Sequence, residues 1–235
     1  MVLDAASMVA DGLARPPVPS AISTAGIVAI GRRLAPGTEP AIADALVRGG
    51  VRAFEITLDG DGALDAIRDL TARCDPAELL IGAGTVLDID SAEAAVAAGA
   101  RFLVMPHVDP SIVAWAAARG IPALPGAFTP TEILAAWRAG AAAVKLFPAS
   151  AVGPAFVREV RGPLREIPLV PTGGVTAETA GAFISAGAIA VGIGSWLTGS
   201  GDPAIVEARA ARLVAAVAAA RITATTTPKA PEPTR

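Results

Sequence analysis

Lysine is the residue type whose placement in this chain most strongly suggests covalent chemistry. Of the 19 basic residues in the 235-residue sequence, only Lys145 and Lys229 are lysines, and the rest are arginines. Lys145 lies in the run Ala-Ala-Ala-Val-Lys-Leu-Phe-Pro, whose continuous apolar pattern is typical of a strand buried on both faces. Burial disfavours the charged form of an amine and frees its lone pair to attack a ketone. We interpret Lys145 as a Schiff-base nucleophile; the competing interpretation is a lysine in a structural ion pair.

Glu55 is the second candidate for chemistry. It lies in Arg-Ala-Phe-Glu-Ile-Thr-Leu, midway along an expected strand, where a carboxylate is costly unless it is paired or has a function. A carboxyl group beside a Schiff base can serve as general base and acid. The alternative is a Lys–Glu ion pair without chemistry, and the two interpretations are compatible.

Glycine-rich segments end two further expected strands. They are Thr172-Gly173-Gly174 and Gly192-Ile193-Gly194-Ser195. Glycines let an anion approach backbone N–H groups, and Ser195 is a candidate start for a short helix that would offer more of them. These segments therefore predict a phosphate site, with tight turns as the alternative. The lone histidine, His107, is interpreted as structural or rim-located rather than catalytic.

Short apolar runs alternate with helical patterns over most of the chain, and this order predicts eight βα units. The expected strands are Ile27–Ile30, Ala53–Thr57, Leu79–Thr85, Phe102–Pro106, Pro122–Gly126, Ala143–Pro148, Leu169–Gly174 and Ala190–Gly194. The expected helices are Glu39–Arg48, Gly62–Ala72, Ser91–Ala98, Pro110–Ala118, Pro130–Ala139, Pro154–Val160, Ala177–Ala186 and Pro203 to about Ala220. Eight such units favour a (β/α)8 barrel, in which strand C-termini point into the site. An open doubly wound sheet is disfavoured because no Gly-x-Gly-x-x-Gly turn follows the first strand.

Composition limits the domain organisation and the possible partners. The length and an apolar content of 53% suit one barrel domain over residues 21–222, after an N-terminal helix and linker (1–20) and before a Thr/Pro-rich tail (223–235) expected to be disordered. A net charge of -3 without a basic patch argues against nucleic acid. No apolar run approaches the length of a membrane-spanning helix, and the N-terminus lacks a secretory pattern. One cysteine and one histidine exclude an internal disulfide and nearly exclude a zinc site. We expect a cytoplasmic protein.

The chain resembles a known family in its motifs, namely the class I 2-keto-3-deoxy-6-phosphogluconate (KDPG) aldolases, grouped with the 4-hydroxy-2-oxoglutarate aldolases. The similar segments follow the family's order over residues 21–220 and are Gly50–Leu58, Ile81–Leu87, Pro125-Gly126 with Thr129–Glu132, Lys145–Pro148, Pro171–Val175 and Gly194–Leu197. The resemblance implies that Lys145 forms the Schiff base and that Glu55 is the general acid/base. It further implies a pyruvyl site lined by Thr85, Pro106 and Phe147, and a phosphate site formed by Gly173, Gly174, Gly194 and Ser195, with Thr172 also at the substrate. A homotrimer without metal or cofactor is also implied.

Asp59 is a departure from the family pattern. Some members have an arginine there, four residues after the catalytic glutamate, which helps bind the substrate carboxylate. An aspartate pairs with a carboxylate only by taking up a proton. Arg32 aligns with an arginine that other members carry at the end of the first strand, and our hypothesis is that Arg32, with Thr85, binds the carboxylate instead.

The predicted reaction is cleavage of 2-dehydro-3-deoxy-6-phosphogluconate to pyruvate and glyceraldehyde 3-phosphate. Three alternatives stay open. The first is the same chemistry on the galactose-configured substrate or on 4-hydroxy-2-oxoglutarate. The second is a phosphate-binding barrel isomerase or epimerase, which would not need Lys145. The third is a non-catalytic trimeric scaffold.

Overall fold

The computed structural model of the protein describes residues 15–226, in which helices alternate with parallel strands. The strands are β1 (Ile27–Gly31), β2 (Ala53–Thr57), β3 (Leu80–Gly84), β4 (Leu103–Val104), β5 (Ala123–Leu124), β6 (Gly126–Ala127), β7 (Val144–Leu146), β8 (Leu169–Pro171) and β9 (Val191–Ile193). The helices are α1 (Ser20–Ser23), α2 (Glu39–Arg48), α3 (Ala63–Arg73), α4 (Ile89–Ala97), α5 (Pro110–Ala118), α6 (Pro130–Arg138), α7 (Gly153–Arg161), α8 (Ala177–Ser185), α9 (Ser195–Thr198) and α10 (Pro203–Thr226), with a short 3-10 helix η2 (Ala149–Ala151).

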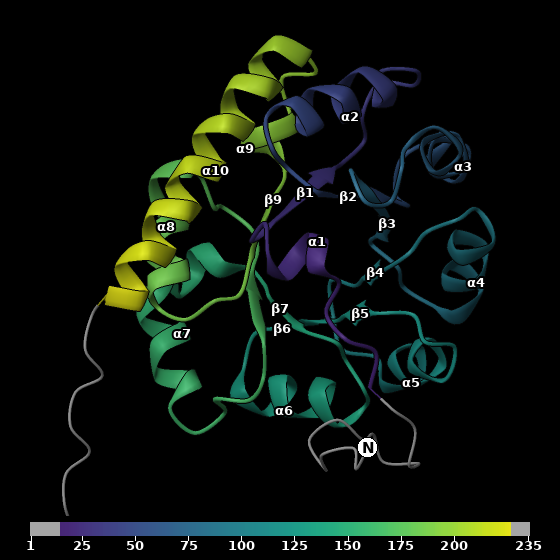
Figure 1. Ribbon diagram of the computed structural model, residues 1–235. Helices are drawn as coiled ribbons and strands as arrows, with labels where there is room; N and C mark the ends of the chain where they lie inside the picture. Colours follow the sequence, from purple (N-terminus) through teal and green to yellow (C-terminus); the bar gives the residue numbers. More distant parts are fainter. Residues whose placement is uncertain (1–14, 227–235) are drawn as a thin grey trace, which may run out of the picture.

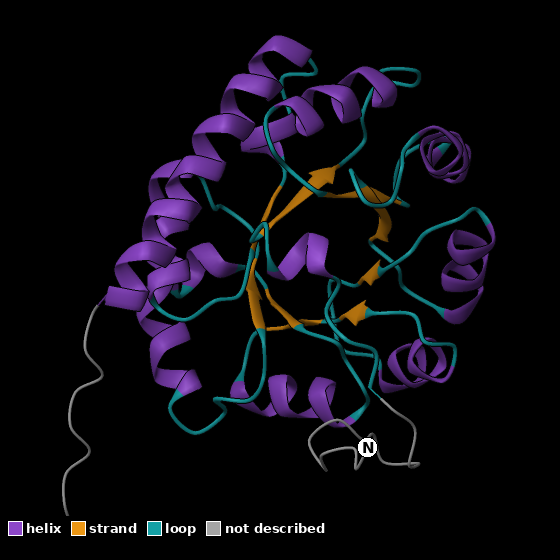
Figure 2. Cartoon of the chain, in the orientation of Figure 1, coloured by secondary structure: helices purple, strands orange, loops and turns teal. Residues whose placement is uncertain are grey.

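The strands form two curled parallel sheets, with orders β5-β4-β3-β2-β1-β9 and β6-β7-β8. Figure 2 shows them arranged around a common centre with helices on the outside. The sequence predicted one strand over 122–126 within a single eight-stranded sheet, whereas the structure divides this strand into β5 and β6 at Pro125. Proline has no N–H to donate to a ladder, which explains the interruption. Between β8 and β9 the contact is reduced to an isolated Thr172–Gly192 bridge and the bond from the Ile189 N–H to the Leu169 oxygen.

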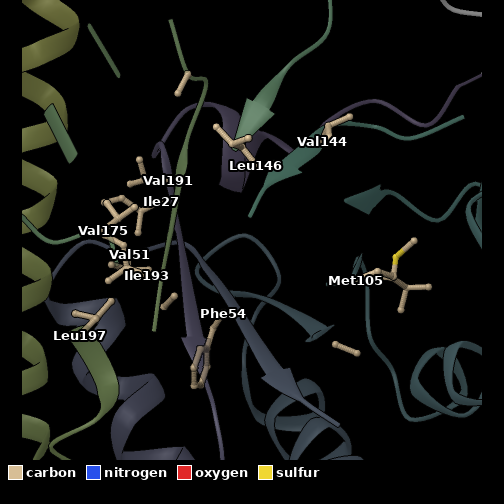
Figure 3. Packing of buried hydrophobic residues seen from close by; sticks show 14 of the residues in the cluster. Ile27, Val51, Phe54, Met105, Val144, Leu146, Val175, Val191, Ile193 and Leu197 are labelled. Carbon is tan, nitrogen blue, oxygen red and sulfur yellow. The ribbon is translucent and has the colours of Figure 1, made fainter. Parts of the chain in front are cut away.

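The apolar core has two parts. A smaller cluster fills the space inside the strands and comprises Ile22, Val28, Ala53, Phe102, Val104, Leu124, Ala143, Val170 and Ala190. Several of its members lie at or just before the first residue of a strand, so α1, which contributes Ile22, covers the N-terminal ends of the strands (Figure 1). The larger cluster packs the strands against the outer helices, and Figure 3 shows the part of it around Ile27, Val191 and Leu197. The C-terminal ends of the strands are thereby left as the open end of the fold.

The two ends of the chain differ in how far the structure describes them. The N-terminal helix expected over residues 3–13 lies outside the described residues, as does the tail from residue 227. The helix expected to end near Ala220 continues to Thr226, so the boundary placed at residue 222 falls inside α10. Arg221 gives a physical reason, since its guanidinium donates to the Ser23 and Ile189 carbonyls at 2.7 and 2.8 Å and ties the end of the helix to the domain. Among the described helices, none is long and apolar enough to cross a membrane.

Gly82→Ala is expected to destabilise the protein by about 1–3 kcal/mol. A Cβ there would lie 2.5 Å from the ring of Phe102, which is fully buried. Gly181→Ala, inside α8, is the matched control, because the nearest atom to its Cβ would be 3.5 Å away. The better helix propensity of alanine should leave that variant as stable as the unaltered protein, or more stable by up to about 1 kcal/mol. Urea unfolding measures both, and equal midpoints for the two variants would contradict the packing argument.

Candidate active site

Two ionisable side chains lie inside the ring of strands. Lys145 is the central residue of β7 and is 4% exposed, and Glu55 is the central residue of β2 and is 2% exposed. Both line one small internal cavity with the apolar side chains of Val28, Ile30 and their neighbours. Two strands that are far apart in the sequence therefore bring the predicted nucleophile and the predicted acid/base to the same enclosed space.

Burial changes the proton affinity of both groups in opposite directions. Desolvation lowers the pKa of the Lys145 amine; the Glu55 charge partly offsets this, and Arg32 adds to it by repulsion. Desolvation also raises the pKa of the Glu55 carboxyl, against the opposing attraction of Lys145 and Arg32. An amine with a lowered pKa is a better nucleophile near neutral pH, and a carboxyl with a raised pKa exchanges protons more readily there. The pair has the properties that Schiff-base chemistry requires.

A cavity of about 370 Å³ opens beside Lys145 at the C-terminal ends of the strands. It is lined by eight of the residues predicted for the site or its immediate neighbourhood: Arg32, Lys145, Phe147, Thr172, Gly173, Gly174, Gly194 and Ser195. Lys145 and Thr172 line both this cavity and the internal one that contains Glu55. Its volume suits a small metabolite of a few carbon atoms with a phosphate group.

Glycines make room for the polar side chains of the site. A Cβ at Gly84 would lie 2.6 Å from Glu55 Oε1, and one at Gly192 would lie 2.3 Å from Thr172 Oγ1. Gly84 ends β3 beside β2, and Gly192 lies in β9 opposite Thr172. Glycine is therefore required at Gly84 and Gly192 by the close approach of a polar side chain from the neighbouring strand.

The glycine-rich loop after β8 is joined to the chain that follows Lys145. Gly173 and Gly174 have φ values of +93° and +74°, a conformation that glycine adopts without strain. The Ala149 N–H donates to the Thr172 oxygen at 2.8 Å, and the Ser150 N–H donates to the Gly173 oxygen at 3.0 Å. The centroid of the Phe147 ring is 5.0 Å from Lys145 Nζ, and the same ring would be 3.2 Å from a Cβ at Gly173. The amine and the candidate anion loop thus share one rigid wall.

Thr85 and Pro106 lie at the ends of β3 and β4 and are half-buried, but neither lines the two cavities described above. Thr85 has a φ of +58°, which is uncommon for a residue with a branched Cβ. Such strain, on the order of 1–3 kcal/mol, is often found at functional positions. Their predicted contact with substrate remains a prediction.

Sequence reasoning did not select four further lining residues, Ile30, Val175, Thr176 and Trp196. Val175 and Thr176 follow the double glycine directly, Trp196 is the second residue of the short helix α9, and Ile30 lies in β1. Their place at the strand ends and in the predicted loops was the available signal. A larger hollow of about 480 Å³ lies between α3 and α4. Its carboxylate Asp65 is already paired with Arg68, and it contains neither of the buried ionisable groups.

Comparison with known proteins gives one consistent family. The family model described as KDPG and KHG aldolase matches residues 20–213. A probable 2-dehydro-3-deoxy-6-phosphogalactonate aldolase of Rhizobium meliloti is 37% identical over 172 residues, which cover 73% of this chain and 81% of that protein. A 2-dehydro-3-deoxy-phosphogluconate aldolase of Pseudomonas aeruginosa is 39% identical over 157 residues, which cover 66% of this chain and 70% of that protein.

A solved structure adds a likeness in three dimensions. The KDPG aldolase of Legionella pneumophila, with pyruvate captured at low pH as a covalent carbinolamine intermediate, superposes with a TM-score of 0.72 at 26% identity. The superposition covers 86% of this chain and 98% of that one.

Glu55→Gln is expected to lower the pKa of Lys145 further, because it removes the charge that supports the protonated amine. Arg32→Ala is expected to raise it, because it removes a repelling cation. The rate of acetylation of Lys145 as a function of pH, followed by peptide mass spectrometry with Nα-acetyl-lysine as an internal reference, measures both shifts. A titration of Lys145 that coincides with the reference would contradict the account of its burial.

Proposed function

The chain belongs to the KDPG and KHG aldolase family and is an aldolase, and from this premise we propose that it cleaves 2-dehydro-3-deoxy-6-phosphogluconate to pyruvate and glyceraldehyde 3-phosphate. The observation that carries the proposal is the position of Lys145, a buried amine with a lowered pKa. Its side chain lies at the junction of the open cavity and the internal cavity that contains Glu55.

The proposed reaction begins with attack of Lys145 Nζ on the C2 carbonyl of the substrate. The carbinolamine loses water to give an iminium ion, which attracts electrons from the neighbouring carbons. Glu55 removes the proton of the C4 hydroxyl, directly or through a water molecule. The electrons of the C3–C4 bond then move toward the iminium nitrogen, and the aldehyde leaves. Glu55 returns a proton to C3 of the enamine, and hydrolysis of the new iminium frees pyruvate and the amine.

We propose that the two ends of the cavity bind the two anionic ends of the substrate. Arg32 would hold the carboxylate next to C2, and Phe147 would line the pyruvyl portion. Thr85, with Arg32 at the carboxylate, and Pro106, at the pyruvyl portion, would complete the site from the ends of β3 and β4, outside the cavity lining. Gly173, Gly174, Gly194 and Ser195 would bind the phosphate through backbone N–H groups, supported by their position after β8 and β9 and by the helix that starts at Ser195. Thr172, between the two cavities, would contact the carbons around the bond that breaks. Orientation by both anions adds to the chemistry of the amine.

We also propose that the two curled sheets are one (β/α)8 barrel, in which β5 and β6 count as a single strand. The supporting observations are the bond from the Lys145 N–H to the Pro125 oxygen, which carries the ladder past the proline, and the Thr172–Gly192 bridge between β8 and β9. A single domain beginning near residue 21, a homotrimeric assembly and a cytoplasmic location remain predictions of the family resemblance and the composition.

The configuration at C4 is the main alternative within this function. The similar proteins include a probable phosphogalactonate enzyme as well as a phosphogluconate enzyme, at 37% and 39% identity. The galactose-configured acid and 4-hydroxy-2-oxoglutarate are therefore the competing substrates. Side-by-side assays of pyruvate release from the three compounds distinguish them, and the proposal requires the highest kcat/KM on the gluconate-derived acid.

Incubation with pyruvate followed by borohydride reduction is expected to add a 1-carboxyethyl group to Lys145, because reduction converts the iminium between Nζ and C2 of pyruvate into a stable secondary amine. Peptide mass spectrometry locates the adduct, and Lys145→Met is the control that should abolish it. Without an adduct on the unaltered protein the aldolase proposal fails. An isomerase, an epimerase or a scaffold would then explain the fold better.

Glu55→Gln is expected to keep the adduct with pyruvate while lowering kcat for cleavage by about 10²–10⁴, the usual contribution of a positioned acid/base. Gln fills nearly the same volume, so the space beside Gly84 is preserved. Coupled assay of pyruvate release measures the loss, and unaltered melting of the variant serves as the control for folding. A variant that cleaves at the original rate would remove Glu55 from the mechanism.

A further inference from the structure

We propose that Asp59 is a positioning residue for Arg32: Arg33 anchors Asp59, and Asp59 holds the Arg32 guanidinium at the cavity, ready for the substrate carboxylate. This inference rests on the proposed function. It assigns a role to the residue that departs from the family pattern and to Arg33, for which the sequence suggested none.

The three side chains share one oxygen. Arg33 Nε donates a hydrogen bond to Asp59 Oδ2 at 3.2 Å, and Arg32 Nη1 lies 3.5 Å from the same atom. Arg33 is therefore the hydrogen-bonded partner and Arg32 the looser one. Of the two arginines, only Arg32 lines the cavity beside Lys145. Asp59 therefore contacts one nitrogen of Arg32 and leaves the rest of the Arg32 guanidinium available to a ligand.

The backbone around these side chains is built to bring them together. The Thr57 hydroxyl at the end of β2 donates to the Gly31 carbonyl at the end of β1, at 3.2 Å. Gly60 lies beside the backbone of Arg33, where a Cβ would make an ordinary van der Waals contact with the Arg33 Cα at 3.4 Å. Arg33 has a φ of +48°, an unfavourable conformation for a residue with a side chain. Strain of this kind persists where neighbouring contacts enforce it, and the hydrogen bond from Arg33 to Asp59 is one such contact.

Asp59 does not use both of its carboxylate oxygens in its ion pairs. Its Oδ1 is buried and, among the described residues, has no hydrogen-bond partner, whereas Oδ2 serves both arginines. The Thr57 hydroxyl lies nearby but donates its one proton to the Gly31 carbonyl, so Asp59 is held through Oδ2 and its two arginines. Burial opposes ionisation of Asp59, but the Thr57 hydroxyl, Arg32 and Arg33 together lower its pKa, so the carboxylate is charged at neutral pH. Because Asp59 shares its negative charge with Arg33, it neutralises the positive charge of Arg32 only in part.

The expected effect of Asp59 is on affinity for the keto-acid end of the substrate. The Arg32 side chain is 48% exposed, and without Asp59 it would be free to adopt solvent-facing rotamers. A carboxylate would then bind only after the side chain was ordered, which weakens binding. Reaction at the amine itself, once a ligand is seated, requires no contact with Asp59.

Borohydride trapping at Lys145 as a function of ligand concentration tests the proposal. Asp59→Asn is expected to raise the half-saturating concentration of pyruvate by roughly tenfold with the maximal extent of trapping unchanged, while trapping of methyl pyruvate, which lacks the carboxylate charge, stays as in the unaltered protein. Asp61→Asn, which removes an exposed carboxylate two residues away, is the matched control for charge alone and should leave the pyruvate value in place. Equal losses for pyruvate and methyl pyruvate would mean a merely structural role and would overturn the inference.

Arg33→Ala provides an independent arm. With its anchor removed, Asp59 is left to pair with Arg32 alone and to compete with the ligand, so the half-saturating concentration of pyruvate should again rise. The double variant Asp59→Asn/Arg33→Ala should match Asp59→Asn, because no competing carboxylate remains. Additive losses would overturn the account in which both arginines share one Asp59 oxygen.

If the unaltered protein forms no adduct, the proposed function itself fails. If it forms one and Asp59→Asn leaves the pyruvate value unchanged, only this inference fails.

Discussion

Burial of the Lys145 amine away from water is the constraint on which the rest of the structure depends. A buried charge is costly, and the protein lowers the cost by making the amine less basic and by placing a carboxyl in the same enclosed space. The apolar side chains around the pair remove most of its contact with water, and this desolvation moves the pKa of both groups from its ordinary value. Burial of Lys145 therefore makes the amine reactive and at the same time costs free energy of folding. The packing of the strands against the outer helices has to offset that cost.

The division of the core explains why this arrangement opens at one end. Ile22 and the interior apolar side chains fill the N-terminal ends of the strands, while the polar residues and the paired glycines lie toward the C-terminal ends. Parallel strands place all their C-termini on one side, so residues from β1, β2, β7, β8 and β9 converge there. The hydrogen bonds from η2 to the loop after β8 then connect the amine with the glycines proposed for the phosphate.

Much of this organisation could be predicted from the sequence because it depends on local patterns. Continuous apolar runs located the strands, and the scarcity of lysine pointed to Lys145. Features that depend on contacts between distant segments were not predictable. The sheet is interrupted at Pro125 because its neighbours in the ladder need an N–H that proline lacks. The last helix continues past Ala220 because Arg221 finds carbonyl partners on α1 and before β9. The link between Arg33 and Asp59, 26 residues apart, arises only when β1 and β2 lie side by side.

Exchange of the pyruvate methyl protons with deuterium from the solvent tests the central claim most directly, because it requires the iminium on Lys145 and proton transfer by Glu55 in a single readout. Proton magnetic resonance in deuterium oxide should show rapid loss of the methyl signal with the unaltered protein, none above background with Lys145→Met, and a rate lower by about 10²–10⁴ with Glu55→Gln. Exchange that persists in Lys145→Met would contradict the account, and exchange at the original rate in Glu55→Gln would contradict the role given to the carboxyl.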